Sequence, residues 1–246
     1  MYTHDKTKTV YVGKVKIGGG NPVSVQSMLS TPSYDVEKSV AQAVALEKAG
    51  CEIIRAAIPD MDAVKLIPAL KQAVNVPIVA DIHFDYRLAL ESVAAGIDKI
   101  RINPGNIGDE GRVKQVADAC RAKNIPIRIG VNSGSVEKEI LAKHGAPTAE
   151  ALVESALYHA SLLEKFDFDD IVLSMKSSTV KSIDYLQREL ASALSIASFS
   201  DVKPRAPYRR RGPRPSSEAS RPRLSPPPRA PACRRGPCRR TSPWRR

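Results

Sequence analysis

The sequence lacks the hydrophobic segments that direct a chain into or across a membrane. None of its apolar runs approaches the roughly 18 residues that a membrane span requires. The first ten residues, MYTHDKTKTV, contain no apolar core of the kind found in a secretory signal. We therefore expect a cytoplasmic protein that has no membrane partner.

The sequence also has little cysteine, with four residues in a chain of 246. This number and spacing do not suggest a disulfide scaffold. Cys51 begins a strand-like run and Cys120 lies in a helical pattern, so we expect both to be small buried hydrophobes. Cys233 and Cys238 do not have the CxxC spacing of a common zinc or cluster site. We predict no metal ligands in this chain.

Most of the chain lacks the basic excess that its net charge of +12 suggests. Residues 203–246 contain fifteen Lys and Arg, one acidic residue and eleven Pro, which leaves residues 1–202 slightly acidic. The main part of the chain therefore gives no electrostatic reason to bind nucleic acid. The arginine-rich segment could bind nucleic acid by itself, and a basic-tail binding protein is kept as an alternative function.

Short apolar strands alternate with segments of helical period after about residue 20. The segments 35–50 and 84–96 have helical spacing and end on Gly50 and Gly96, the residue type that commonly follows a helix. The six predicted strands lie at 22–28, 51–58, 77–83, 99–105, 126–132 and 170–176.

Consecutive βα units with strands that are apolar on both faces predict a parallel sheet covered by helices. A Rossmann fold would carry a GxGxxG turn after its first strand, and the sequence GGGNP precedes that strand instead. Polar residues at the ends of almost all strands favour a TIM-type (β/α)₈ barrel. We predict an incomplete α/β barrel of about six units over 1–195, followed by a disordered Arg/Pro-rich tail over 196–246.

The polar residues at the strand ends repeat at alternate positions, which point to one face of a strand. The residues concerned are Gln26, Arg55, Asp81 and His83, Arg101 and Asn103, Arg128, Gly130 and Asn132, and Ser174 and Lys176. If the sheet closes, these groups meet at one mouth, and we expect Gly130 to leave space beside Arg128.

Four of these side chains, Arg55, Arg101, Arg128 and Lys176, are cations that would repel one another in a mouth of low dielectric constant. A bound anion would relieve the repulsion, and Arg is suited to bidentate contacts with phosphate oxygens. The pattern therefore predicts a small ligand with more than one phosphate. Asp81 and His83 are candidates for proton transfer or for orienting a neighbouring group.

Plainer interpretations remain open for the same residues. Any single Arg could be an ion-paired surface group, and Asp81 could cap a helix that begins at Phe84. The GGGNP sequence could be a phosphate loop, although a hairpin turn is the simpler interpretation. We expect the remaining histidines, His4, His144 and His159, to lie at the surface.

Several long stretches resemble the bacterial 4-hydroxy-3-methylbut-2-enyl diphosphate synthases, the GcpE-type enzymes of the methylerythritol phosphate route to isoprenoids. The resemblance covers about residues 5–190. It is carried by GNPVSVQSM, AGCEIIRAAIPDM, VPIVADIHFDYRLAL, GIDKIRINPGNIG, PIRIGVNSGS and DIVLSMKSS.

The resemblance implies an oxidoreductase that opens the ring of 2-C-methyl-D-erythritol 2,4-cyclodiphosphate by a two-electron reductive dehydration. It also implies a [4Fe–4S] cluster, ferredoxin or flavodoxin as electron donor, and a homodimer. By the same resemblance, Arg55, Arg101, Arg128 and Lys176 would bind the diphosphate. Asp81, His83, Asn103 and Asn132 would surround the ring, with Asp81 and His83 as the catalytic candidates.

The sequence departs from that family after SIDYLQRELASAL, where its composition changes to Arg and Pro. We expect the last barrel strands and the family's C-terminal iron–sulfur domain, with its cluster ligands, to be absent, as a frameshift would produce. The chain alone would then be inactive, partly folded or poorly soluble, and rapidly digested by protease. The residues also allow a different phosphate-binding barrel enzyme, for example of pterin type, or a product without function.

Overall fold

The computed structural model describes residues 7–134, 136–176 and 197–200. All of these residues belong to one compact unit, Met1–Lys203, and the second unit, Pro204–Arg246, lies outside the described residues. The predicted disordered tail therefore also lies outside them, except for residues 197–200.

Seven parallel strands form one sheet, in which each strand pairs with the next one along the chain. In sheet order the strands are β3 (Gln26–Met28), β4 (Ile53–Ala57), β5 (Ile78–Asp81), β6 (Lys99–Ile102), β7 (Ile127–Asn132), β8 (Ile171–Lys176) and β9 (Ala197–Ser200). The first six are the predicted strands. The predicted α/β barrel class, with a barrel that is incomplete, is confirmed.

Strand β9 is an addition to the predicted set. It pairs in parallel with β8, with Val172 opposite Ala197. For these four residues the structure differs from the predicted disordered tail, because the short sequence ASFS lacks the apolar run that marked the other strands. Pairing with a neighbouring strand, rather than local sequence, forms this strand.

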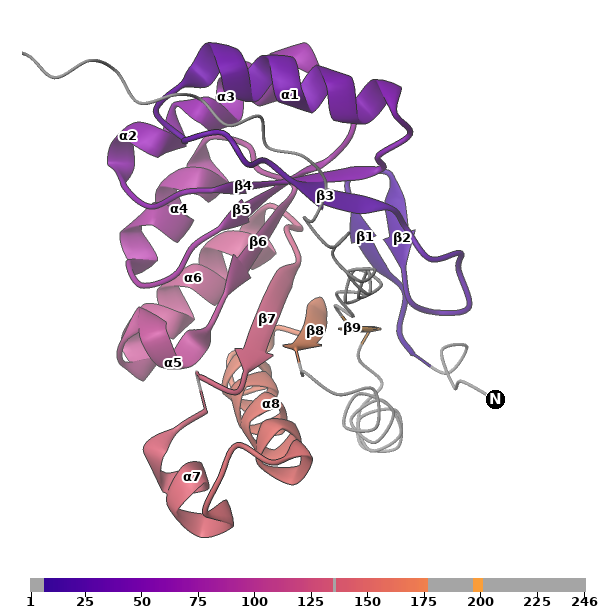
Figure 1. Ribbon diagram of the computed structural model, residues 1–246. Coiled ribbons are helices and arrows are strands. Elements are labelled where there is room, and N and C mark those ends of the chain that lie inside the picture. The colour runs from indigo at the N-terminus through magenta and orange to yellow at the C-terminus, as the bar shows by residue number, and fades with distance from the viewer. Residues whose placement is uncertain (1–6, 135, 177–196, 201–246) are drawn as a thin grey trace, which may run out of the picture. The chain divides into compact units, whose positions relative to one another are not determined.

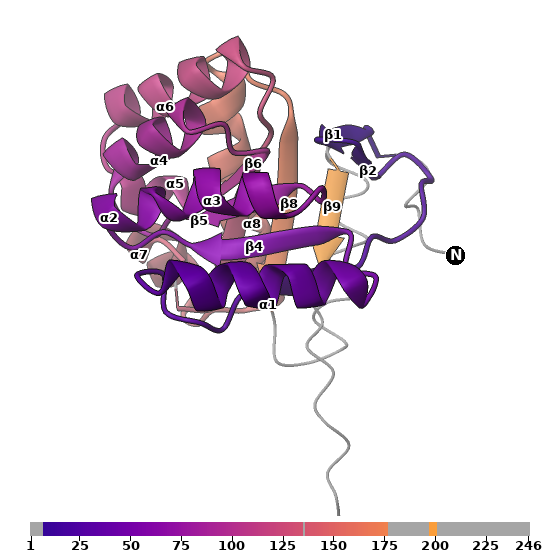
Figure 2. The ribbon, with the colours of Figure 1, turned by 90° about the horizontal axis from the view of Figure 1, so that it is seen from above.

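The helices follow the strands along the chain and lie on one side of the sheet (Figures 1 and 2). They are α1 (Val36–Lys48), α2 (Met61–Val64), α3 (Leu66–Ala73), α4 (Tyr86–Ala94), α5 (Pro104–Ile107), α6 (Glu110–Ala122), α7 (Lys138–His144) and α8 (Ala149–Glu164). The main hydrophobic core lies between them and the sheet, because alternate strand residues such as Ile54, Ile100 and Ile129 point toward the helices.

A β-hairpin, β1 (Val10–Val12) and β2 (Val15–Ile17), lies on the other side of the sheet (Figures 1 and 2). Its apolar residues form a second core with Ile53, Val79 and Val172, which are the first or second residues of their strands. The hairpin therefore covers the amino-terminal end of the inner face.

The glycines of the GGGNP sequence follow the hairpin and do not form its turn. Gly18, Gly19 and Gly20 all have positive φ, and the Asn21 amide donates to the Gly18 carbonyl oxygen at 3.1 Å. The hairpin itself turns at Gly13 and Lys14, between β1 and β2. The prediction of a hairpin turn at this sequence is therefore wrong, because the turn formed by its glycines lies after β2 and joins no hairpin strands.

Aspartate side chains begin four of the described helices. Asp35, Asp60, Asp85 and Asp109 each accept a hydrogen bond from a backbone amide in the first turn of the helix that follows. Asp85, not Asp81, caps α4, so the alternative role of Asp81 as a helix cap is wrong. Asp81 is thereby left for the inner face.

The two described cysteines are buried, as predicted. Cys51 precedes β4 and Cys120 lies in α6 against the main core. Burial raises the pKa of the Cys120 thiol to about 12, so this thiol stays protonated at neutral pH.

Candidate functional site

The inner face of the curled sheet carries an excess of basic side chains. Alternation along the strands places Arg55, Lys99, Arg101, Arg128 and Lys176 on this face, opposite the helix-covered face. Asp81 is the carboxylate among the inner-face positions of the described strands. A mouth with this composition favours an anionic ligand.

Asp81, the last residue of β5, joins three of the predicted site residues. Its Oδ2 accepts a hydrogen bond from Arg55 Nη2 at 2.5 Å, and its Oδ1 accepts one from Arg101 Nη1 at 3.2 Å. The register places Ala57 and Arg101 on either side of Asp81, and Arg55 lies two residues before Ala57 on the same face. Because the Asp81 side chain is 1% exposed, water does not compete for these bonds.

The electrostatic environment keeps Asp81 ionised. Burial acts to raise the pKa of this carboxyl, but the charges of Arg55 and Arg101 and the hydrogen bond from Arg55 outweigh burial and lower the pKa. At neutral pH Asp81 is therefore a carboxylate that holds two guanidinium groups in place.

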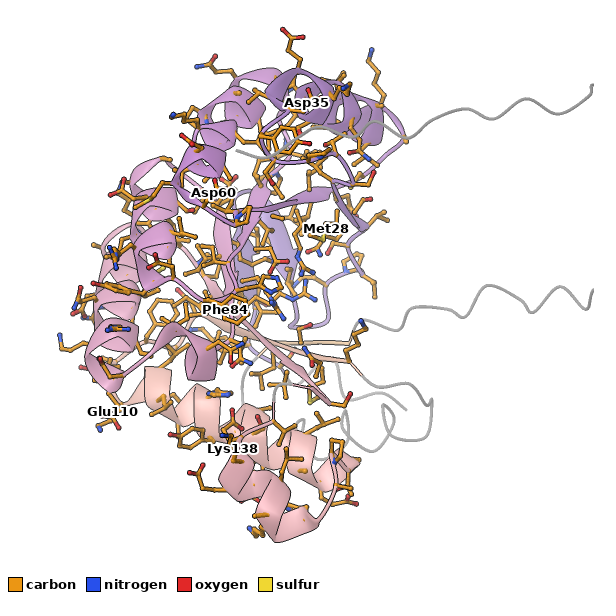
Figure 3. All side chains as sticks on the ribbon, turned by 60° about the vertical axis from the view of Figure 1, so that its left-hand side comes forward. Met28, Asp35, Asp60, Phe84, Glu110 and Lys138 are labelled. Carbon is orange, nitrogen blue, oxygen red and sulfur yellow. The ribbon has the colours of Figure 1, made fainter. Side chains whose placement is uncertain are left out.

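His83 lies at the rim of this cluster. Its Nε2 is 3.3 Å from Asp81 Oδ2, and its side chain is 57% exposed. The neighbouring Phe84 is also exposed, and the two ring centroids are 6.0 Å apart. Figure 3 shows Phe84, together with Met28 and Asp60, where the chain leaves β5, β3 and β4. His83 can thus contact both Asp81 and a ligand from solvent.

Arg128 on β7 belongs to a separate, deeper network. Its side chain is buried, with Nη2 donating to Ser174 Oγ at 2.7 Å and Nη1 donating to Gln26 Oε1 at 3.4 Å. Strands β7 and β3 are not neighbours in the sheet. The contact between Arg128 and Gln26 therefore crosses the inner side, and it shows how strongly the sheet curls.

The remaining predicted site residues are placed by the ends of β6, β7 and β8. Asn103 directly follows β6 and is buried. Asn132 ends β7, where its Oδ1 accepts a hydrogen bond from the Gly134 amide at 2.9 Å. Asn132 lies opposite Lys176, which ends β8 and is exposed. These three residues share the carboxyl edge of the sheet with the Asp81 cluster.

Two features of the inner face were not found from the sequence. Lys99 is 1% exposed and lies two residues before Arg101 on β6. This alternate spacing could have placed Lys99 on the inner face from the sequence. Gly130 makes room for Arg101 of the neighbouring strand, and not for Arg128 as expected. The space beside this glycine is occupied by a side chain of the neighbouring strand. A single sequence does not reveal which side chain that is.

The histidines expected at the surface are placed differently. His159 is fully buried on α8, with its Nε2 2.5 Å from Glu137 Oε1. His144 is partly buried, and its Nε2 lies 2.8 Å from Glu154 Oε2. The surface prediction is wrong for His159, whose carboxylate partner is 22 residues away in the chain, whereas His144 stays partly exposed beside a partner 10 residues away. His4 lies outside the described residues.

The described residues do not fit an iron–sulfur cluster. A [4Fe–4S] cluster takes four ligands, commonly Cys thiolates. Cys51 and Cys120 are buried on separate elements, and no group of three or more His, Cys, Asp or Glu among the described residues could hold a metal ion. Cys233 and Cys238 lie outside the described residues.

A curled parallel sheet, with helices on one face and polar side chains at the carboxyl ends of its strands, defines a TIM-barrel protein with its candidate site in the barrel mouth. The chain belongs to the GcpE family, because residues 7–199 match the GcpE TIM-barrel domain. This membership supports the enzyme interpretation, and it does not support the basic-tail alternative.

Curated relatives carry the name 4-hydroxy-3-methylbut-2-en-1-yl diphosphate synthase (flavodoxin). The protein from Fusobacterium nucleatum is 56% identical over 186 residues, which are 76% of this chain and 52% of that protein. The protein from Geobacillus kaustophilus is 55% identical over 176 residues, which are 72% of this chain and 47% of that protein. The chain thus spans about half the length of these relatives.

Solved structures with low sequence identity share the fold. The 3-dehydroquinate dehydratase of Geobacillus kaustophilus superposes with a TM-score of 0.58 at 14% identity, covering 81% of this chain and 80% of that one. Dihydropteroate synthase from Xanthomonas albilineans gives 0.52 at 15% identity, covering 79% and 76%. These likenesses concern the barrel alone.

Within the described part of the chain, no helix is long and apolar enough to cross a membrane.

Proposed function

We propose that this chain supplies the substrate-binding barrel of a 4-hydroxy-3-methylbut-2-enyl diphosphate synthase. Its ligand is 2-C-methyl-D-erythritol 2,4-cyclodiphosphate, which the whole enzyme opens and dehydrates by a two-electron reduction. The observation that supports this proposal is the basic inner face, where two arginines are fixed on the buried Asp81. Family membership supports this substrate class, and the positive charge fits its two phosphates.

In this proposal the cations bind the phosphates, and the amides surround the ring. Arg55, Arg101, Arg128 and Lys176 contact phosphoryl oxygens, and Asn103 and Asn132 provide neutral hydrogen bonds. Asp81 orients its two arginines, because its low pKa keeps it an acceptor at neutral pH. His83 is the group that moves a proton, since it is the exposed partner of that carboxylate.

The redox part of the reaction requires groups outside the described residues. We propose that a [4Fe–4S] cluster and the electrons come to this site from elsewhere, with flavodoxin as the donor, or ferredoxin in its place. The printed names of the relatives support flavodoxin. We also propose a homodimer and a cytoplasmic location, which agree with a soluble electron donor.

Isothermal titration of the full chain with the cyclodiphosphate tests the binding function. We expect binding that weakens as salt is raised, because cations and phosphates attract through charge. Arg101→Ala should weaken binding at least about tenfold, the loss of a charge-assisted hydrogen bond.

Arg121→Ala is the matched control, because Arg121 is an arginine of α6 that pairs with Asp118 away from the inner face. We expect its affinity to equal that of the unmodified chain. An unmodified chain that binds no cyclodiphosphate, or an equal loss in the two variants, would contradict the proposed function.

A further inference from the structure

Gly130 on β7 lies directly beneath the guanidinium group of Arg101. A Cβ atom at position 130 would lie 2.7 Å from Arg101 Cζ and closer still to its Nη2 and Nε. Ordinary side-chain contacts leave more than 3 Å between such atoms, so the guanidinium occupies the space that any other residue's Cβ would need.

The path of the Arg101 side chain explains why this space is needed. Arg101 pairs in register with Arg128, yet its guanidinium lies over Gly130, two residues further along β7. Its Nη1 meanwhile reaches Asp81 on β5. One guanidinium thus spans from β5 to β7, while Arg128 bonds to Ser174 and Gln26. The two arginines, side by side in the backbone register, have different partners.

Backbone geometry does not account for a glycine at this position. Gly130 lies inside a regular strand and is not among the glycines with positive φ. A glycine inside a strand weakens it relative to a residue with a side chain. Space for a neighbouring side chain is the remaining physical reason for glycine here.

We propose that Gly130 is a positioning residue, which seats the Arg101 guanidinium between β5 and β7 so that it can receive a phosphate. The role of that phosphate rests on the proposed function, whereas the position of the Arg101 guanidinium over Gly130 does not. An alanine at 130 would move only the flexible end of Arg101, so the fold would persist while the guanidinium leaves its place.

A double-mutant cycle on the full chain tests the proposal, with inorganic pyrophosphate as the probe in titration calorimetry. Gly130→Ala should weaken pyrophosphate binding about tenfold, the loss expected when one charge-assisted contact is displaced. Arg101→Lys removes the planar group above residue 130. In the Arg101→Lys background we expect Gly130→Ala to change the affinity less than about twofold.

The same cycle in thermal unfolding needs no ligand. With Arg101 present, Gly130→Ala should lower the melting temperature by about 2–4 °C. With Arg101→Ala present, the added methyl group enters free space, and the melting temperature should stay the same or rise. Gly111→Ala in α6 is the glycine control, and its effect should not depend on the residue at position 101.

The outcomes separate the two proposals. If the unmodified chain does not bind pyrophosphate but the melting temperatures show coupling between positions 130 and 101, the positioning role of Gly130 is supported and the phosphate-binding function is contradicted. If the effects of Gly130→Ala and the Arg101 substitutions simply add in the thermal cycle, Gly130 has no seating role, whatever the affinity for pyrophosphate.

Discussion

At the scale of single residues, the buried carboxylate of Asp81 determines the geometry of the candidate site. Two guanidinium groups from β4 and β6 converge on it, and each is less than one fifth exposed. Removing the carboxylate leaves two largely buried cations without their counter-charge, which costs far more than the loss of a surface ion pair. Asp81 thus links the stability of the barrel to the placement of two arginines at the candidate site.

We expect Asp81→Asn to lower the free energy of unfolding by about 3 kcal/mol. A carboxyl whose pKa is lowered by folding stabilises the fold above its ordinary value of 3.8, and this stability is lost as the pH falls through the folded pKa. Urea unfolding between pH 6 and pH 3 should show this loss in the unmodified chain and a flatter profile in the variant. Parallel profiles would contradict the assignment.

His159 gives a second pH dependence, with a different origin. Burial lowers the pKa of this imidazole, although Glu137 acts to raise it. A base with a lowered folded pKa stabilises the fold above its ordinary value of 6.5, and stability falls as the pH drops below that value. His159→Gln should reduce the loss of stability between pH 7.5 and pH 5 in urea titrations. His83→Gln is the exposed control, and an equal effect of both variants would refute this explanation.

The sequence indicated which side chains share the inner face better than it indicated their hydrogen-bond partners. Alternation along each strand identified Arg55, Asp81 and Arg101, because this spacing is a property of the backbone itself. The grouping of these three residues, and the separate network of Arg128, depend on the curl of the sheet. A single sequence carries no direct signal for that curl.

At the scale of elements, four helices begin on an Asp side chain that accepts a backbone hydrogen bond. In α1, α2 and α4 the Asp lies in the segment that joins a strand to its helix, and Asp109 lies between α5 and α6. In α6, Asp109 Oδ1 accepts the hydrogen bond from the Arg112 amide at 3.0 Å. The helix termini therefore help to hold the loops around the site.

We expect Asp109→Ala to lower the free energy of unfolding by about 1 kcal/mol, the usual cost of removing an N-cap. Amide hydrogen exchange in the first turn of α6 should become faster in this variant. Asp109→Asn keeps an accepting oxygen and should behave nearly as the unmodified chain does. Equal destabilisation by the two substitutions would show that charge, rather than capping, matters here.

The elements were predictable where several local signals agreed. The sequence 35–50 combines Asp35, helical spacing and a terminal glycine, and the structure forms α1 there. The strands β1, β2 and β9 have three or four residues each and were not predicted. Length alone does not explain the failure, because β3 also has three residues and was predicted. The unpredicted strands form where a partner strand is available, so their stability is a property of the tertiary fold.

At the scale of the whole compact unit, the described sheet is open, with β3 and β9 as its outer strands. Strand β3 has one neighbour in this sheet, and Val23 and Val25 beside it are 77% and 58% exposed. An edge strand flanked by exposed apolar residues is a template for pairing with another chain. The expectation of poor solubility therefore has a defined physical origin.

We expect the chain to self-associate through this edge and Val25→Lys to raise the monomer fraction several-fold, because a charged edge resists strand pairing. Light scattering coupled to size-exclusion chromatography measures the change. Tyr11→Lys replaces an equally exposed apolar residue on the hairpin and should have little effect. If both substitutions raise the monomer fraction alike, general surface hydrophobicity is the cause.

The hairpin of β1 and β2 determines from which end a ligand can reach the inner face. Its valines and isoleucine cover the inner face at the strand beginnings, so a ligand would reach the arginines from the carboxyl ends of the strands. Under the proposed function, substrate and product would then share the rim formed by the carboxyl ends of the strands, and an obstruction there would block both.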